Sequence, residues 1–499
     1  MRWALASLLC LGAGAVRRSP AFAVGSAEPR PPALHRHACT APRAPLTMSA
    51  SPPEEGLAVR PLPASAPAPQ SLPPATSSVA GAAALVAGTT VGAGILALPA
   101  KTLAAGFWPS TGALFLAWLY MAASGILIAE VNVNTLCGLG RNSVSIRSMA
   151  SETLGDAAAA ISGAVYVFIH YALLVAYILQ GGAIASELLH LPAAWGAGGF
   201  AAAVGGGMLI GTAQQIERLN GALVVGVVAT FAALVVAGLP LIQPALLAHA
   251  SPAEVLPSVP VLVLALVFHN VVPTICYGLG CDLPKIRSAI IFGSALPFAM
   301  FVAWDAVILG STPWEAAAMA GATGEIFDPL LELRNSGGAF AELVRAFSLL
   351  AIVTSFIGFT FGLSDYWADV LGWDAPDATP SEGCEGAELG EAAERPLGQK
   401  GALYALALSP PLAVACSDPT LFFAAIDNAG AFGILTLFGI FPAAMAWQQR
   451  YGPEASPAME PALPGGRLTL ATMGALAAGI VGVQAWERLS LLLASELSW

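Results

Sequence analysis

The chain has 499 residues, of which 57% are apolar and 10% are charged, and its formal net charge is −11. An ordinary soluble domain carries about 25% charged residues, so a soluble protein of this composition would expose apolar surface and aggregate. The acidic balance excludes a nucleic-acid-binding protein, because no basic stripe is present to neutralise phosphates. We therefore predict an integral membrane protein.

Residues 1–76 have the composition of a cleaved leader. Arg2 precedes an apolar run, Trp3–Val16, which is shorter than the ~20 residues needed to span a bilayer. The run is followed by two arginines and the small-residue stretch Ala21-Phe22-Ala23, as in a secretory signal peptide. Residues 24–76 then contain four Arg, no Lys and three acids, which is a transit-peptide pattern. The whole segment resembles the bipartite leaders of algae with secondary plastids and predicts a plastid envelope, with a plain signal peptide and a plasma or other cell membrane as the alternative.

Long apolar runs alternate with short polar breaks from residue 77 onward. Backbone groups in lipid must hydrogen-bond within their own segment, so we predict about eleven transmembrane helices. They lie near 78–104, 110–136, 157–187, 196–212, 219–240, 257–280, 288–310, 339–371, 400–416, 419–447 and 467–487. Nine basic residues fall in the inner loops and four at the outer ends when the N-terminus is inside, which favours that orientation. The acidic stretch 374–399 is predicted to be a solvated inner loop without chemistry of its own.

Two of the apolar segments are predicted to be broken. The first contains three glycines within seven residues and then a proline, in the run Gly88-Thr-Thr-Val-Gly92-Ala-Gly94-Ile-Leu-Ala-Leu-Pro99. Each glycine costs about 1 kcal/mol in a helix interior, so a break is predicted here, with close GxxxG packing of helices as the alternative. The sixth segment carries Phe268-His269-Asn270-Val-Val-Pro273 in mid-membrane, where polar groups are expensive and usually functional.

Breaks in segments one and six are typical of an inverted repeat of five helices. We predict repeat one at 78–240, repeat two at 257–447 and an extra helix at 467–487. The substrate is expected at the midplane, between the two breaks. Half-helix N-termini there favour a carboxylate and free carbonyls favour an ammonium group, which suits a zwitterionic amino acid.

Four stretches of the membrane part have a characteristic order and spacing. They are Gly88–Pro99, Ala129-Glu130-Val-Asn132-Val-Asn134, Phe268–Arg287 and Gly362–Asp369. In these stretches the chain resembles the tryptophan/tyrosine permease family, which belongs to the amino acid/polyamine/organocation transporter superfamily. The resemblance covers about 78–447. It implies an all-α polytopic membrane protein with a leucine-transporter-like 5+5 inverted repeat, and proton-coupled transport of aromatic amino acids.

Candidates for substrate binding lie in the two breaks and in the third segment. They are Thr89, Thr90, Gly92, Ala93, Gly94, Tyr171, Phe268, His269, Asn270 and Thr274. Tyr171 and Tyr177 are six residues apart, about 240° around a helix, so only one is expected to face the site, and we predict Tyr171. His269 is predicted either to relay a proton or to form a neutral hydrogen-bonding wall of the site.

Candidates for ion coupling combine intramembrane acids, a histidine and hydroxyl groups. They are Glu130, His269, Thr354, Ser355 and Asp365. Glu130 is either functional or a structural partner of neighbouring helix ends. Thr354 and Ser355 lie in a stripe of small and polar residues that is predicted to pack against the first segment, and their hydroxyls could also bind sodium. Asp305 and Asp427 could join a proton relay or merely face water near the outer helix ends.

The predicted function is secondary active transport of tyrosine or tryptophan, with proton coupling favoured over sodium. The expected partners are the amino-acid substrate, the coupling ion and the lipid bilayer. The alternatives are a permease for another neutral amino acid, such as serine or threonine, and a receptor without transport activity on the same scaffold. The sequence contains no ATP-binding motif and no catalytic or metal-ligating constellation, so no enzyme activity, cofactor or metal is predicted.

Overall fold

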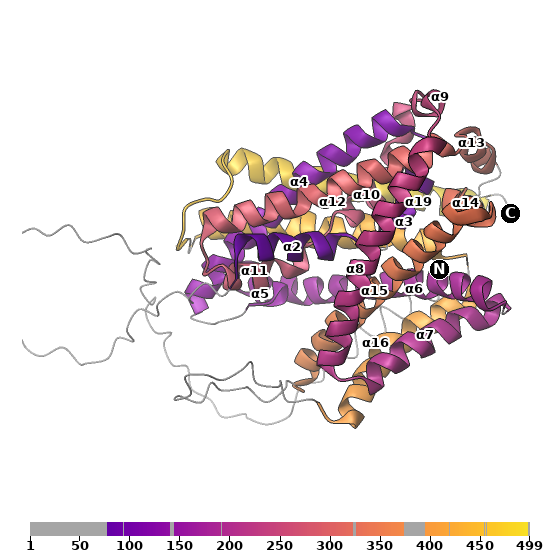
Figure 1. Ribbon diagram of the computed structural model, residues 1–499. Helices are drawn as coiled ribbons and strands as arrows, with labels where there is room; N and C mark the ends of the chain where they lie inside the picture. The colour runs from indigo at the N-terminus through magenta and orange to yellow at the C-terminus, as the bar shows by residue number, and fades with distance from the viewer. Residues whose placement is uncertain are drawn as a thin grey trace, which may run out of the picture.

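The computed structural model describes residues 77–92, 94–139, 144–190, 192–322, 326–373, 395–418, 420–453, 455 and 457–497. Within these ranges the chain consists of helices and their connections, without a β-strand, as predicted for an all-α protein (Figure 1). The leader, Ala93 in the first break and residues 374–394 of the acidic loop lie outside the described residues. At the far end of that loop, helix α16 already begins at Leu397.

The first half of the membrane part has one broken helix followed by four continuous ones. They are α2 (Val79–Thr90) with α3 (Gly94–Thr102), α4 (Phe107–Leu139), α6 (Asp156–Leu189), α7 (Ala193–Ile210) and α8 (Ala213–Gly238). The axes of α2 and α3 are bent by 57° at the predicted break. The short helix α5 (Ile146–Leu154) connects α4 to α6.

The second half repeats this order of a broken helix and four more spans. They are α10 (Val259–Ala265), η4 (His269–Val271) and α11 (Val272–Gly278), then α12 (Leu283–Ser311), α15 (Gly338–Leu371), α16 (Leu397–Ser417), and α17 (Phe422–Asn428) continued by η5 (Ala429–Ile440) and α18 (Phe441–Tyr451). The segment η5 is π-helical over its 12 residues. A last helix, α19 (Gly466–Leu497), follows. The connections contain α9 (Pro244–Leu247), α13 (Glu315–Ala322) and α14 (Pro329–Asn335).

Each of the eleven predicted segments contains at least one of these helices. Eight spans in the described part are long and apolar enough to cross a membrane, and the bent pair α2–α3 would be a ninth. The apolar part of α7 is shorter, covering Trp195–Ile210. Helix α16 does not meet the same criterion, and it carries Lys400 in its first turns and Pro410 and Pro411 in its second half.

Side chains that precede the helices explain where several of them begin. The Ser78 side chain accepts a hydrogen bond from the backbone of Gly81 at the start of α2, and Asp282 accepts one from Lys285 at the start of α12. Thr212 and Gln215 form a reciprocal capping box at the start of α8. These caps satisfy backbone amides that have no partner within the helix.

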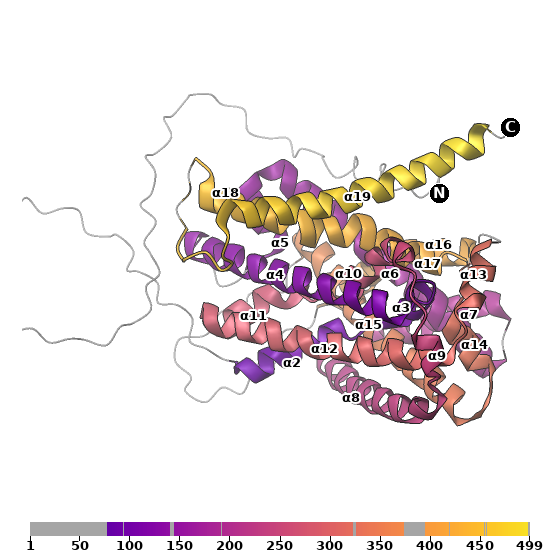
Figure 2. The ribbon, with the colours of Figure 1, turned by 90° about the horizontal axis from the view of Figure 1, so that it is seen from above.

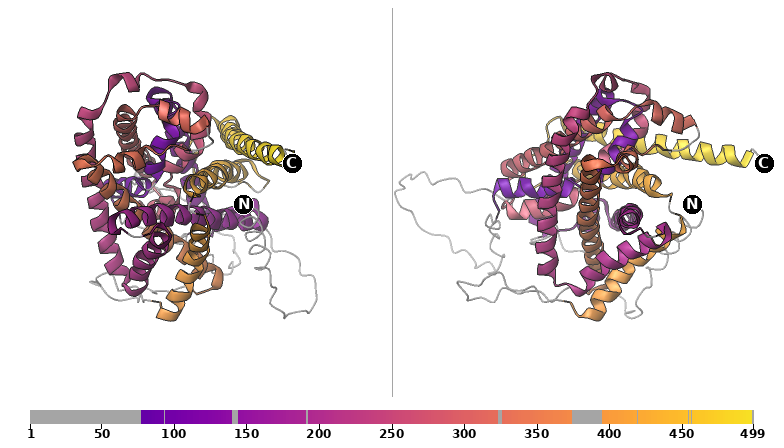
Figure 3. Two further views of the ribbon diagram at one scale, coloured as in Figure 1. Left: turned by 90° about the vertical axis from the view of Figure 1, so that its right-hand side faces the viewer. Right: turned by 45° about the vertical axis from the view of Figure 1, so that its right-hand side comes forward.

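The half-helices α3 and α10 are largely buried inside the bundle, whereas α2 and α11 each leave one side exposed. α2 runs along α12, and an added Cβ on Gly293 of α12 would lie 2.6 Å from the carbonyl oxygen of Ala83 and from the Cβ of Val86. The missing side chain therefore allows the close approach of these two helices. α6 packs against α7, α15 and α16, and α8 packs along α15. α19 packs against η5 and α18, and its end projects beyond the bundle (Figures 2 and 3).

The two ends of the bundle are named here by the predicted orientation. The inner end carries α5 and α11, and the outer end carries α9, α13 and α14, which lie at the left and right of Figure 1 respectively. α3 and α17 belong to the outer half, and α2 and α18 belong to the inner half (Figure 2).

Candidate functional site

The two breaks lie against each other inside the bundle. α3 begins at Gly94, where an added Cβ would lie 3.0 Å from the Cα of Ala265, the last residue of α10. The glycine therefore lets the start of α3 approach the end of α10 closely. Each break leaves backbone amides and carbonyls outside the regular helical ladder, and these groups can bind the charged ends of an amino acid.

Helix α15 closes the first break from another side. An added Cβ on Gly92 would lie 2.7 Å from the Ser355 Oγ, so the absence of a side chain allows this close approach of α15. The Tyr177 hydroxyl of α6 is within hydrogen-bonding reach of the Ser355 side chain, and its ring stands edge-on to Phe359, with 5.6 Å between ring centroids. The break, α6 and α15 thus meet at Gly92, Tyr177 and Ser355.

Tyr171 does not face this junction, and its role in substrate binding stays a prediction. Its hydroxyl donates to the carbonyl of Leu406 on α16, at 2.9 Å. The two tyrosines lie on different sides of α6, as their spacing requires. The packing of α16 against one side and of α15 against another decides which tyrosine reaches the break.

The threonine hydroxyls of the predicted site bond within their own helices. Thr89, Thr90 and Thr354 each donate to the carbonyl four residues earlier, at 2.8, 2.8 and 3.0 Å. Their hydrogens are therefore engaged, while the oxygen lone pairs can still accept a hydrogen bond or bind a cation. Ser355 is the hydroxyl that contacts the first break directly.

His269 and Phe268 pack on the side of the sixth span that faces α4 and η5. The imidazole of His269 is fully buried and stacks between the rings of Phe268 and Phe438, with centroid distances of 4.7 and 4.8 Å. Neither ring nitrogen has a hydrogen-bond partner among the described residues, although the backbone of Met121 lies nearby. Phe268 lies against Gly125 of α4, where a Cβ would be 2.6 Å from the ring.

Asn270 and Thr274 do not belong to the buried junction that the sequence predicted for them. Both side chains are exposed, whereas His269, next to Asn270, is fully buried. Successive residues of the helical turns η4 and α11 face different directions, so the break cannot bring all of its polar side chains to one point. The sixth span contacts the first break through the end of α10, at Ala265.

Glu130 is held by an ion pair near the inner end. Its carboxylate accepts two hydrogen bonds from the guanidinium of Arg450 on α18, both at 2.7 Å, and a third from the backbone of Ala462 at 2.6 Å. Arg287 of α12 donates to the carbonyl of Ala462. The acid therefore joins α4, α18 and the connection to α19, which favours the structural alternative for Glu130.

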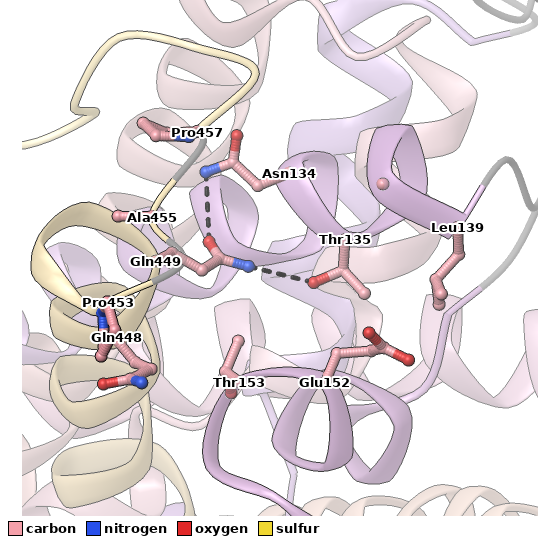
Figure 4. A pocket seen from close by; sticks show the side chains of 11 residues that line it. Asn134, Thr135, Leu139, Glu152, Thr153, Gln448, Gln449, Pro453, Ala455 and Pro457 are labelled. Atoms are coloured by element: carbon pink, nitrogen blue, oxygen red, sulfur yellow. Dashed lines mark hydrogen bonds between the residues drawn. The ribbon is translucent and has the colours of Figure 1, made fainter. Parts of the chain in front are cut away.

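A cavity of about 260 Å³ opens beside this ion pair at the inner end, between α4, α5 and α18 (Figure 4). Asn134 donates to Gln449 at 3.1 Å, and Gln449 donates to Thr135 at 3.1 Å. The Asn134 carbonyl oxygen accepts from the backbones of Ala458 and Met459. The polar groups around the cavity thus bond to one another and clamp the connection between α18 and α19.

Asp365 lies far along α15 from the junction, so its predicted role in coupling is not supported by its position. Its side chain is 66% exposed and pairs with Arg395 at 2.9 Å, just before α16. Ten residues of continuous helix separate it from Ser355, which corresponds to about 15 Å along the axis. The stripe of small and polar residues on one face of α15 therefore extends well past the junction.

A further ion pair, which the sequence did not indicate, joins the outer halves of the first and tenth spans. Lys101 at the end of α3 donates to Asp427 of α17 at 2.6 Å, and both side chains are mostly buried. The Lys101 ammonium also lies 5.8 Å from the ring centroid of Phe423. The two partners are 326 residues apart, so only the folded chain reveals the pair.

The sequence matches the tryptophan/tyrosine permease family over residues 75–384 and 390–484. It is 29% identical over 321 residues to the tryptophan-specific transport protein of Pseudomonas aeruginosa, a match that covers 61% of this chain and 76% of that protein. It is 26% identical over 390 residues to the tyrosine-specific transport system 2 of Haemophilus influenzae, covering 74% of this chain and 87% of the relative. These relatives are transporters and not enzymes.

Among solved structures, the fold is similar to that of MhsT in complex with L-phenylalanine. The TM-score is 0.55 at 15% sequence identity, and the match covers 81% of this chain and 96% of that one. MhsT has the leucine-transporter fold, so the predicted fold class is confirmed.

We predict that the substitution Glu130→Gln destabilises the protein. Arg450 would be left buried without its countercharge, which is expected to cost about 3–5 kcal/mol and to lower the thermal unfolding temperature of the purified protein. The double variant with Arg450→Leu should recover part of the loss, and Glu152→Gln on the exposed face of α5 is the matched control. Unchanged unfolding of Glu130→Gln, together with lost uptake, would instead make Glu130 a functional acid.

Proposed function

The chain belongs to the tryptophan/tyrosine permease family, and from this premise we propose that it is a secondary active transporter of tryptophan and/or tyrosine, coupled to protons. The observation that carries the proposal is the contact of the two breaks at Gly94 and Ala265, closed by Ser355 at Gly92. In a permease with the leucine-transporter fold, this junction is where a substrate would meet unpaired backbone groups. We place repeat one at 78–240, repeat two at 257–447 and the extra helix at 467–487.

The junction supplies both polarities that an amino-acid zwitterion needs. The amide of Ile95, near the start of α3, donates to the carbonyl of Gly92 at 3.3 Å, and the N-terminus of α3 at the break carries a partial positive charge that favours the substrate carboxylate. The carbonyls at the end of α2 and the end of α10 lack a following helical turn, so they can accept from the substrate ammonium. Because Gly92 and Gly94 have no side chains, the substrate can approach this backbone closely.

Aromatic side chains beside the junction support an aromatic substrate. Tyr177 and Phe359 stand at Ser355, and ring pairs of this kind favour edge-on or offset contacts with a further ring. The names of the bacterial relatives specify tryptophan or tyrosine, and the MhsT structure holds L-phenylalanine. We therefore propose tryptophan and tyrosine as substrates.

Proton coupling is the finer part of this proposal. His269 is a fully buried titratable group whose ring nitrogens are unpartnered among the described residues, and intramembrane groups of this kind commonly serve in proton relays. Sodium coupling would instead draw on the hydroxyl oxygens of Thr354 and Ser355.

The proposal is tested with the purified full chain in proteoliposomes. We expect labelled tryptophan or tyrosine, but not serine, to accumulate when an inward proton gradient is imposed, and a protonophore to abolish the accumulation. Preference for serine would identify a permease for another neutral amino acid. Accumulation that follows sodium and ignores pH would overturn proton coupling, and the absence of any uptake or exchange would favour a receptor.

We predict that Gly92→Leu abolishes both uptake and exchange while the protein still inserts into the membrane. The new side chain would collide with Ser355 and block the backbone that binds the carboxylate. Gly88→Leu on α2 is the matched control, because an added Cβ there meets nothing within 4 Å. Uptake by Gly92→Leu at the original rate and apparent affinity would contradict the position of the site.

We propose further that residues 1–76 are a plastid-targeting leader that the transporter does not need for transport. A chain that begins at Ser77 should retain exchange in proteoliposomes, and residues 1–76 fused to a fluorescent reporter should direct it to a plastid. Failure of the shortened chain to fold would contradict the first expectation. A reporter confined to the plasma membrane would contradict the second.

A further inference from the structure

Asp305 is a buried acid in the outer half of α12 that the site described above does not use. It lies six residues before the end of the helix, and only 2% of its surface is exposed. Its Oδ1 has no hydrogen-bond partner among the described residues. An ionised carboxylate in such a place is very costly unless a countercharge accompanies it.

The side chain of Thr102, at the end of α3, lies within hydrogen-bonding reach of the Asp305 carboxyl. Lys101 is the adjacent cation, but its ammonium is bonded to Asp427 at 2.6 Å. Asp305 therefore differs from Glu130 and Asp427, each of which has its own basic partner.

The remaining elements packed against α12 bring no countercharge to Asp305. Helices α2 and α9 and the turn η1 contain no titratable residue, and α11 contributes only a cysteine and a tyrosine. Three other titratable groups on neighbouring elements have partners of their own, namely Tyr120 and Glu130 on α4 and His249 after α9, which bonds to the carbonyl of Ala104. Glu217 and Arg218 lie at the start of α8, toward the inner end.

The hydrogen bonding of Thr102 favours a protonated neighbour. Its hydroxyl donates its single hydrogen to the carbonyl of Leu98 at 2.8 Å. The oxygen can then offer Asp305 only a lone pair, and a carboxyl group can use that lone pair only when it carries a proton to donate. A carboxylate at this position could accept from this hydroxyl only if the hydroxyl gave up its bond to Leu98.

The position of this pair connects it to the first break. Thr102 ends α3, the outer half-helix that begins at Gly94 in the junction, and α3 packs against α12. The contact between Asp305 and Thr102 therefore lies at the interface between the outer half of the broken span and the adjacent continuous helix. A charge appearing on Asp305 would weaken this interface, and a proton would restore it.

We propose that Asp305 binds the coupling proton, so that α3 packs against α12 when the carboxyl is protonated and separates from it when the proton leaves. The inference rests on the proposed proton-coupled transport and names the group that carries it. A proton from one side of the membrane adds to a carboxylate oxygen of Asp305, and it later leaves that oxygen toward the other side. No bond between heavier atoms changes.

The test compares Asp305→Asn with the wild-type full chain in proteoliposomes. Asparagine keeps the shape of the neutral acid but cannot release a proton. We expect exchange of preloaded tryptophan or tyrosine to persist and to become independent of pH. Accumulation driven by a pH gradient should fall to the level seen without a gradient, and substrate-induced proton uptake should vanish. Asp369→Asn, at an exposed position near the inner end of α15, is the matched control.

Thr102→Val provides a second variant that keeps Asp305 in place. Loss of the neighbouring hydroxyl changes how readily Asp305 holds its proton, so the pH of half-maximal transport should shift, whereas Thr102→Ser should keep it. An unchanged pH of half-maximal transport in Thr102→Val would overturn the proposal. This comparison decides the question even if Asp305→Asn does not fold.

The outcomes separate this inference from the function on which it rests. If the wild type exchanges no aromatic amino acid, the proposed function fails. If the wild type is driven by protons and Asp305→Asn still concentrates substrate under a pH gradient, only the role of Asp305 is overturned. If protons drive uptake by the wild type, and Asp305→Asn exchanges substrate without being driven by protons, both the proposed function and the role of Asp305 are supported.

Discussion

The hydrocarbon core of a bilayer contains no water, so every backbone amide and carbonyl there must find its partner within the protein. This constraint makes the membrane part of the chain helical, and it makes an interrupted helix expensive unless neighbouring elements cover the interruption. The breaks persist here because they contact each other at Gly94 and Ala265, and because α15 covers Gly92 with Ser355. The proposed substrate junction is therefore also the place where the backbone has unused hydrogen-bonding capacity.

The same constraint divides the intramembrane titratable groups into two kinds. Glu130 with Arg450, and Lys101 with Asp427, are closely paired and join spans that are far apart in sequence. Pairs of this kind lock helices together, and removing one partner leaves a charge without compensation. His269 and Asp305 are buried without a countercharge, so burial favours their neutral forms, and either would take up charge only with a change in its surroundings. Structural anchoring and the proposed coupling thus fall to different residues.

Much of the architecture follows from local sequence. The apolar runs predicted every one of the eleven helical segments, and Gly92, Gly94 and the Phe268–Pro273 stretch located both breaks. Local sequence does not decide where individual side chains lie. Tyr171 contacts α16 instead of the junction, Asp365 pairs with Arg395 at the inner end, and Asn270 and Thr274 are exposed. Spacing along a helix groups residues by face but does not say which neighbour covers that face.

The sequence alone therefore determined where this chain is helical and where the helices break, because lipid imposes helicity on each segment separately. The fold followed from the order of the two breaks together with the resemblance to a known family. Only the tertiary structure decided that Tyr177 reaches Ser355, that Arg450 neutralises Glu130 and that Thr102 adjoins Asp305. Those contacts join residues from different spans. The rotation and depth at which two helices pack depend on all the side chains between them, such as the absence of one at Gly293, and not on the pattern of either helix alone.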